Sequence, residues 1–173
     1  GLSAALEAKR NGSNVVVLSK THPTHSQTCQ AQGGINASID NDEVSIKAHI
    51  QDTYKGSHKL GNIDNINVMC KEAGNTIKWL DEIGVPFSRN KENKVAQRRF
   101  GAASKIRTCY SSDYTGLKIL HTLYDESIKE NIKFFNEYLL LNIIHQNGIA
   151  IGITALNIKT TTVVEIFAKS IIL

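Results

Sequence analysis

A short apolar run followed by a polar loop that ends in two glycines constrains the fold of this chain most strongly. Residues 15–18 are Val-Val-Val-Leu, and the polar loop occupies residues 21–34. An alanine-rich helical pattern over residues 2–11 precedes the run. A helix followed by a continuously apolar strand is typical of a parallel sheet, and small residues let such a helix lie close to it. We therefore predict an α/β fold that begins like a Rossmann-type dinucleotide-binding unit.

The rest of the chain is predicted to add helices and a C-terminal β-meander. Further helices are predicted over residues 44–56, 64–83 and about 116–128. An irregular polar segment is expected over about residues 85–112. Strands rich in β-branched residues, separated by turn sequences, are predicted over residues 134–144, 149–158 and 163–173. No repeat or linker divides the sequence, so residues 1–173 are expected to form one partial domain.

Composition excludes several classes of function. The chain has 173 residues, 41% of them hydrophobic, and a formal net charge of +4, which suits one globular core. Its basic residues are scattered among acidic ones without aromatic interleaving, which argues against nucleic-acid binding. The three cysteines are far apart and odd in number, so they predict no disulfide framework and fit a reducing compartment. No apolar stretch reaches the roughly 18 residues of a membrane span, so membrane association is expected only through a partner.

Both ends of the chain are expected to be truncated. Only Gly1 could belong to the three-glycine fingerprint of a dinucleotide-binding unit, whose first strand and first glycines would then precede it. The other end stops at Leu173, inside a strand-like run. In many such units a carboxylate after the second strand binds ribose, whereas this chain has Ser19-Lys20 at that place.

The loop and several later segments resemble one family. After Ser-Lys, residues 23–34 contain Pro-Thr, Ser-Gln-Thr and Ala-Gln-Gly-Gly in succession. Further segments with the same resemblance lie at residues 52–57, 84–89, 97–101, 107–108 and 120–124. Together these segments resemble the succinate dehydrogenase and fumarate reductase flavoprotein subunits over essentially the whole chain. The resemblance implies a truncated Rossmann-like FAD-binding domain and FAD as its cofactor.

The resemblance also implies which residues contact the cofactor and the substrate. Gly33 and Gly34 lack a Cβ that would block a flavin ring, and their N–H groups could bind flavin or a carboxylate. The residues expected at the cofactor are Gly1, Ser19, Lys20, Thr24, Ser26, Gln27, Thr28, Ala31, Gln32, Gly33, Gly34 and Leu140. The residues expected beside a dicarboxylate substrate are Gln32, Gly33 and Phe100. Without the resemblance, the serines and threonines are turn formers, Gln32 satisfies its own turn and Phe100 is a core residue.

Gln27 departs from the family pattern in a way that matters for the chemistry. Most relatives carry the flavin-bonded histidine at this position. An amide is a poor nucleophile toward the flavin methyl group, so we predict that FAD binds noncovalently. The absence of the electron-withdrawing covalent bond should lower the flavin potential and favour fumarate reduction.

The histidines are assigned structural roles. His22 and His25 are three residues apart with no nearby cysteine or carboxylate, so a metal site is not predicted. His121 lies among apolar residues of a predicted helix and is expected to be a packed core histidine.

The resemblance implies an enzyme that interconverts succinate and fumarate, working with an iron–sulfur subunit and membrane anchor subunits. The expected location is the cytoplasmic face of the inner membrane, held there through those partners. The acid–base and carboxylate-binding residues of the family lie beyond residue 173, so no catalytic residue is assigned and the chain alone is expected to be inactive. Two alternatives remain: L-aspartate oxidase or a soluble fumarate reductase, and a flavin-binding piece without activity.

Overall fold

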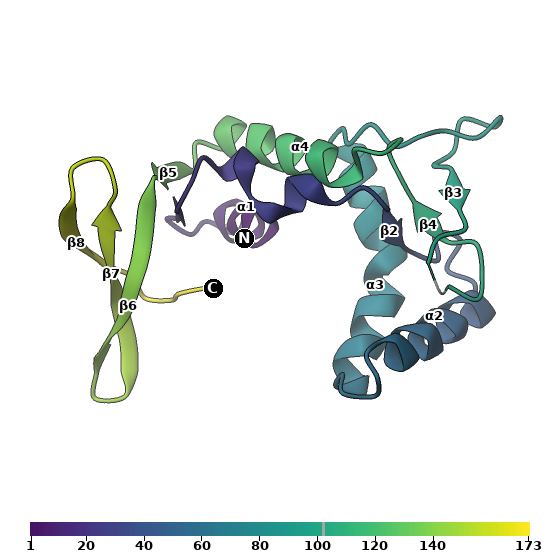
Figure 1. Ribbon diagram of the computed structural model, residues 1–173, viewed down its shortest axis with the longest axis horizontal. Coiled ribbons are helices and arrows are strands. Elements are labelled where there is room, and N and C mark those ends of the chain that lie inside the picture. Colours follow the sequence, from purple (N-terminus) through teal and green to yellow (C-terminus); the bar gives the residue numbers. More distant parts are fainter. Residues whose placement is uncertain (102) are drawn as a thin grey trace. The chain divides into compact units, whose positions relative to one another are not determined.

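The computed structural model describes residues 1–101 and 103–173, which belong to two compact units (Figure 1). The first unit contains residues 1–26 and 123–173, and the second comprises the chain between them. Helix α4 (Thr115–Lys129) contributes its beginning to the second unit and its end to the first. No helix within the described residues is both long and apolar enough to cross a membrane.

A parallel pair of strands lies at the centre of the first unit. Strand β1 (Val16–Ser19) pairs with β5 (Lys133–Asn136). Helix α1 (Leu2–Arg10) contacts β1, and the side chains that it buries are Leu2, Ala5 and Leu6. The predicted helix, the predicted strand and the α/β fold with a parallel sheet are therefore confirmed.

The first unit ends in the predicted antiparallel β-meander. Its strands are β6 (Tyr138–Gln146), β7 (Ile149–Asn157) and β8 (Thr162–Phe167), in that spatial order. Asn147 (φ 53°) and Gly148 (φ 79°) form the tight turn between β6 and β7, and both lie in the left-handed region. Two consecutive positive φ angles are typical of the hairpin turn that favours Asn-Gly.

Two strand boundaries in this region were predicted wrongly. The strand expected over residues 134–144 is divided at Glu137, whose φ is 62°. The part before Glu137 pairs with β1, whereas the part after it pairs with β7. The strand expected over residues 163–173 ends at Phe167. The sequence prediction passed over the polar pairs Asn136-Glu137 and Lys169-Ser170, because apolar residues resume after each pair.

Two capped helices dominate the second unit. In α2 (Glu43–Gly56) the Asp42 carboxylate accepts a hydrogen bond from the Ser45 N–H at 2.8 Å. In α3 (Ile63–Glu82) the Asn62 side chain accepts hydrogen bonds from the N–H groups of Asp64 and Asn65, at 2.9 and 3.0 Å. Each cap satisfies N–H groups that have no partner inside the helix, which explains where the helices begin.

The buried face of α3 differs from the prediction at one position. The side chains that this helix buries are Ile66, Cys70, Gly74, Ile77 and Leu80. Met69 was expected on the same face but is 52% exposed. Gly74 belongs to the buried face because the Ser38 backbone packs closely against it. A Cβ at Gly74 would lie only 2.7 Å from the Ser38 carbonyl oxygen. The chain therefore approaches α3 at a glycine, which a count of apolar residues does not detect.

A small antiparallel sheet lies in the segment that was predicted to be irregular. Its strands are β2 (Ile35–Asn36), β4 (Thr108–Cys109) and β3 (Gln97–Arg98), with β4 in the middle. Each strand contains only two residues, too few for an alternating pattern to be visible. The sheet fixes the end of the glycine loop against residues more than sixty positions later in the chain.

His121 is not the core residue that the sequence predicted. On α4 the neighbouring side chains of Ile119 and Leu120 are buried, whereas His121 is exposed. Successive residues are rotated by about 100° around a helix axis, so His121 lies off the buried face.

Candidate functional site

Ser19 and Lys20 lie at the carboxyl end of the parallel strand pair, where ligands of open α/β sheets commonly bind. Ser19 ends β1 and is half-buried, and Lys20 is exposed. Asn136 lies opposite Ser19 in the strand register, and its Oδ1 is buried without a hydrogen-bond partner. Sequence reasoning missed Asn136, because only the pairing of β1 with β5 brings it to this edge.

The turn that follows, η1 (Pro23–His25), is held by His22. The imidazole Nδ1 of His22 lies 2.8 Å from the Thr24 hydroxyl, and its Nε2 lies 3.4 Å from the Tyr124 hydroxyl. The Tyr124 ring packs against His22 and also against Phe134 of β5. Thr24 is buried, and its hydroxyl is engaged by His22. Ser26, which follows the turn, is half-buried.

Gly1 and Leu140 are the remaining predicted residues of the first unit. Gly1 precedes the first turn of α1, and a Cβ built on it would meet no atom within 4 Å. Backbone N–H groups at such a helix start attract anions. Leu140 lies on β6 opposite Ala155 and is half-buried.

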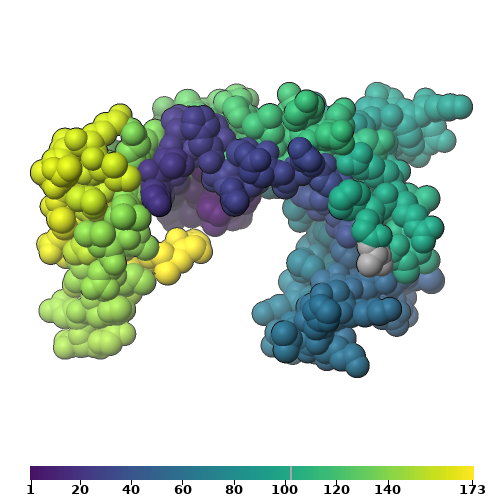
Figure 2. Space-filling model, in the orientation of Figure 1, coloured from purple at the N-terminus to yellow at the C-terminus, as the bar shows by residue number. Residues whose placement is uncertain are grey.

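In the second unit the loop begins with η2 (Gln27–Gln30) and presents exposed side chains. The dark blue segment that contains η2 lies on the visible surface in Figure 2. The predicted ligands exposed in it are Gln27, Thr28, Ala31 and Gln32. Gly116 at the start of α4 donates its N–H to the Ala31 carbonyl at 2.8 Å. A Cβ at Gly116 would collide with the Thr28 carbonyl oxygen, so the loop is seated directly on this glycine.

Neighbouring residues of the protein occupy the space that side chains at Gly33 and Gly34 would need. A Cβ at Gly33 would lie 2.5 Å from Cε1 of Phe100, because the ring covers this residue. Gly34 has a φ of 116°, and a Cβ there would collide with the Cys109 carbonyl oxygen. From the sequence, both glycines were expected to leave space for a flavin ring. The structure adds that the protein's own ring and strand already occupy the positions of both Cβ atoms.

Arg98 holds the carbonyl groups of the glycine loop. Its Nη2 donates to the carbonyl oxygens of Gln32 at 3.2 Å and Gly33 at 3.0 Å. Its guanidinium also lies 4.4 Å from the ring centroid of Tyr110 and 5.8 Å from that of Phe100. Sequence reasoning quoted Arg98 within a motif but gave it no role. The signal was present, since the motif also contains Phe100.

The contacts of Arg98 determine where the loop directs its hydrogen-bond donors. The chain contains no cis peptide bond among the described residues. In a trans peptide the carbonyl and the N–H point in opposite directions. With the carbonyls of Gln32 and Gly33 turned toward Arg98, the N–H groups of Gly33 and Gly34 point away from it. Successive N–H groups on one side of a loop are suited to an anionic or carbonyl oxygen of a ligand.

Phe100 is an exposed aromatic surface next to these donors. It is 52% exposed, so the sequence-based alternative of a core phenylalanine is wrong. An apolar ring beside backbone donors and an arginine suits a planar, polar ligand. No group of three or more His, Cys, Asp or Glu side chains able to hold a metal is found among the described residues.

The second unit also contains an ion pair between a buried arginine and a partly buried aspartate. Arg107 is 1% exposed and pairs with Asp52 of α2. Burial opposes ionisation of Asp52, yet hydrogen bonds from Ser104 and Arg107 hold its pKa below the usual carboxyl value. Burial, together with the charge of Arg107, lowers the pKa of His49 on the same helix. Sequence reasoning missed all of these roles, because burial of a charged pair has no local sequence signal.

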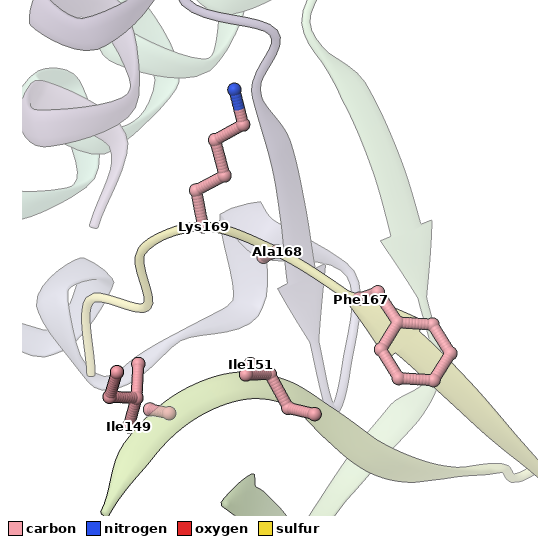
Figure 3. Close-up of a pocket in the computed structure, with 6 residues that line it drawn as sticks. Ile149, Ile151, Phe167, Ala168 and Lys169 are labelled. Atoms are coloured by element: carbon pink, nitrogen blue, oxygen red, sulfur yellow. The ribbon is translucent and has the colours of Figure 1, made fainter. Parts of the chain in front are cut away.

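The hollows detected in the structure lie away from the predicted ligands. A hollow of about 480 Å³ in the first unit is lined by residues of β7 and by the end of β8 (Figure 3). Ile149, Ile151 and Phe167 give it an apolar wall, and Lys169 extends away from the isoleucines. Ligand sites generally add convergent polar groups to an apolar wall, and this hollow has none, so the loop remains the candidate site.

Known proteins match the chain along its whole length. The family model described as FAD binding domain matches residues 1–173. The succinate dehydrogenase flavoprotein subunit of Rickettsia bellii is 42% identical over 167 residues, which cover 91% of this chain and 28% of the relative. The 8-methylmenaquinol:fumarate reductase flavoprotein subunit of Wolinella succinogenes is 42% identical over 176 residues, which cover 100% of this chain and 29% of the relative.

A solved structure agrees with these matches. A chain of E. coli quinol fumarate reductase superposes with a TM-score of 0.89 and 30% identity, over 97% of this chain and 29% of that chain. The present chain therefore spans less than a third of the length of the relatives that it matches.

Proposed function

The chain belongs to the FAD-binding domain family of succinate dehydrogenase and fumarate reductase flavoprotein subunits, and we propose that it is the cofactor-holding part of such a subunit. FAD, when bound, supplies the hydride chemistry that interconverts succinate and fumarate. The observation that carries the proposal is the glycine loop, in which Arg98 holds the carbonyls of Gln32 and Gly33 and leaves the following N–H groups facing the other way.

The loop residues fit a flavin cofactor. Gln27, Thr28 and Gln32 are exposed and can donate hydrogen bonds, and the Gly33 and Gly34 N–H groups can bind a carbonyl or carboxylate oxygen. In the first unit, Ser19 and Lys20 offer donors at the strand edge, and Gly1 opens the helix start that suits a phosphate. Thr24, Ser26, Ala31 and Leu140 complete the proposed contacts.

Phe100 and Gln32 are proposed to border the substrate. The exposed Phe100 ring can exclude water beside the Gly33 N–H, which strengthens a hydrogen bond to a carboxylate there. No residue of this chain is proposed to transfer a proton. The dicarboxylate, its proton donor and the remaining carboxylate-binding groups are proposed to meet in the longer protein.

The chain is further proposed to hold FAD noncovalently. Gln27 is exposed on η2, and its amide cannot form the bond that a histidine makes with the flavin methyl group. The whole protein is proposed to exchange electrons with an iron–sulfur subunit and to reach the cytoplasmic face of the inner membrane through anchor subunits. The names of the relatives, which are flavoprotein subunits, support the assignment to a protein that works with other subunits.

Replacing Arg98 in the full-length protein tests the assignment. We expect Arg98→Met to lower the bound FAD per protein and, with it, succinate–dye and dye–fumarate turnover, because the loop carbonyls lose their donor. Arg99→Met is the matched control, since Arg99 is exposed and neighbours Arg98 in sequence. A full-length protein that purifies without FAD and takes up none on addition would contradict the proposed function.

The isolated chain should lack turnover. A purified piece comprising residues 1–173 is expected to show no succinate oxidation or fumarate reduction, because no proton donor is assigned within it. The assay adds FAD and uses the full-length protein as the positive control. Detectable turnover by the piece would place the acid–base group inside these residues.

A further inference from the structure

The carboxylate of Asp52 on α2 binds two residues of the segment that follows Phe100. Oδ2 of Asp52 accepts hydrogen bonds from the backbone N–H and the hydroxyl of Ser104, both at 2.8 Å, and it also pairs with Nη2 of Arg107. We call these three residues, Asp52, Ser104 and Arg107, the Asp52 cluster. Three donors on one oxygen fix two separate points of the segment to a single position on the helix.

The Arg107 branch of the cluster leads to Gly34. The carbonyl of Arg107 accepts the Ala37 N–H at 2.8 Å, and strand β4 begins at the next residue. Strand β4 pairs with β2, which follows the glycine loop directly. The Cys109 carbonyl of β4 lies against Gly34 so closely that a Cβ could not fit. A shift of Arg107 would therefore move the strand on which Gly34 rests.

The Ser104 branch leads to Phe100. The Ala103 N–H, one residue before Ser104, lies 3.4 Å from the Phe100 carbonyl oxygen. The Phe100 ring covers Gly33 so closely that a Cβ at Gly33 would lie 2.5 Å from Cε1 of the ring. The two branches of the Asp52 cluster thus end on the two consecutive glycines of the loop.

The charge of Arg107 makes this arrangement sensitive to Asp52. Arg107 is almost completely buried, and its Nε and Nη1 have no hydrogen-bond partner within the described residues. Asp52 supplies the one carboxylate that pairs with it there. Burial and the charge of Arg107 lower the pKa of His49, which lies one helical turn before Asp52. A buried cation that loses its carboxylate must move toward water or another acceptor.

We propose that Asp52 is a positioning residue for the face formed by the glycine loop and Phe100. It acts through Arg107 on strand β4, against which Gly34 packs, and through Ser104 on the Phe100 ring, which covers Gly33. Asp52 itself does not contact a ligand. The positioning of the loop and Phe100 by Asp52 does not depend on which ligand binds. Only the effect of Asp52 on FAD and substrate binding rests on the proposed function.

A fluorine label on Phe100 tests the proposal directly. The full-length protein would carry 4-fluorophenylalanine at position 100, and the ¹⁹F resonance would be recorded with and without Asp52→Asn. We expect the variant to shift or broaden the resonance and to weaken FAD binding roughly tenfold, in the range for residues coupled through one network. Glu43→Gln is the matched control, because Glu43 lies on the same helix, is largely exposed and pairs only with Lys47 among the described residues.

Ser104→Ala keeps the test decisive if Asp52→Asn fails to fold. It removes one of the three donors and leaves the ion pair intact, so we expect a smaller change of the ¹⁹F resonance in the same direction. A resonance in either folded variant that matches the wild type and Glu43→Gln would overturn the proposal. A wild-type protein that binds no FAD would instead overturn the proposed function, and the resonance would still report on Asp52.

Discussion

Position 33 favours glycine because the Phe100 ring occupies the space of a Cβ atom, and not because of its backbone angles. Its φ is not in the left-handed region, yet a Cβ would approach the ring to 2.5 Å. The single residue therefore reports how tightly the loop and the ring are packed. Sequence inspection identified Gly33 and Phe100 separately, but the contact between them could be learned only from the structure.

Gly33→Ala is expected to lower both stability and FAD affinity of the full-length protein. The added methyl group must displace the half-exposed Phe100 ring, which can move aside, so we expect a cost of about 0.5–1 kcal/mol, below the range for overpacking in a core. Gly56→Ala is the matched control, because a Cβ at Gly56 meets nothing within 4 Å and alanine favours the helix. Urea unfolding and FAD titration measure the two effects. Equal stability of the two variants would show that the ring does not restrict Gly33.

His49 should make stability fall on mild acidification. Its pKa is lowered in the folded state, so below the ordinary histidine pKa near 6.5 the unfolded chain binds a proton that the folded chain resists. The free energy of unfolding is therefore expected to decrease as the pH falls from 7 toward 5. The decrease should be smaller in His49→Gln. Identical pH dependence of urea unfolding in both proteins would show that His49 is not the responsible group.

Among the elements, the capped helices are the ones that the sequence predicts well. The observed ends of the capped helices α2 and α3, and also those of α4, lie within one or two residues of the predicted ends. The strands β2, β3 and β4 could not be predicted, because two-residue strands are defined by their partners rather than by a local pattern. The break at Glu137 was missed for a similar reason, since it reflects which neighbour each half of the segment pairs with.

The start of α3 offers a test at the scale of an element. Asn62→Ala removes the side chain that caps two N–H groups and is expected to cost about 1 kcal/mol of stability. Asn67→Ala is the control, because Asn67 lies inside the same helix, where alanine is the better helix former. Equilibrium unfolding of both variants provides the comparison. If Asn62→Ala were as stable as Asn67→Ala, the cap would contribute nothing to where α3 begins.

Across the whole molecule, family membership rests on agreement along the full chain, whereas the cofactor assignment rests on a few residues. The family model covers residues 1–173, and the relatives include both succinate dehydrogenases and fumarate reductases. The amino-acid sequence of the glycine loop already indicated the family. Sequence reasoning did not identify Arg98, Asp52 or Arg107 as supports of the loop, because their roles depend on contacts between distant segments.

Acid precipitation of the purified full-length protein tests most directly the claim that this chain holds FAD without a covalent bond. The amide of Gln27 is a poor nucleophile toward the flavin methyl group, so the denatured protein should release its flavin. We predict a colourless pellet and a supernatant that contains about one FAD per protein molecule. A pellet that stays yellow after washing, or a protein that carries no flavin before precipitation, would contradict the account.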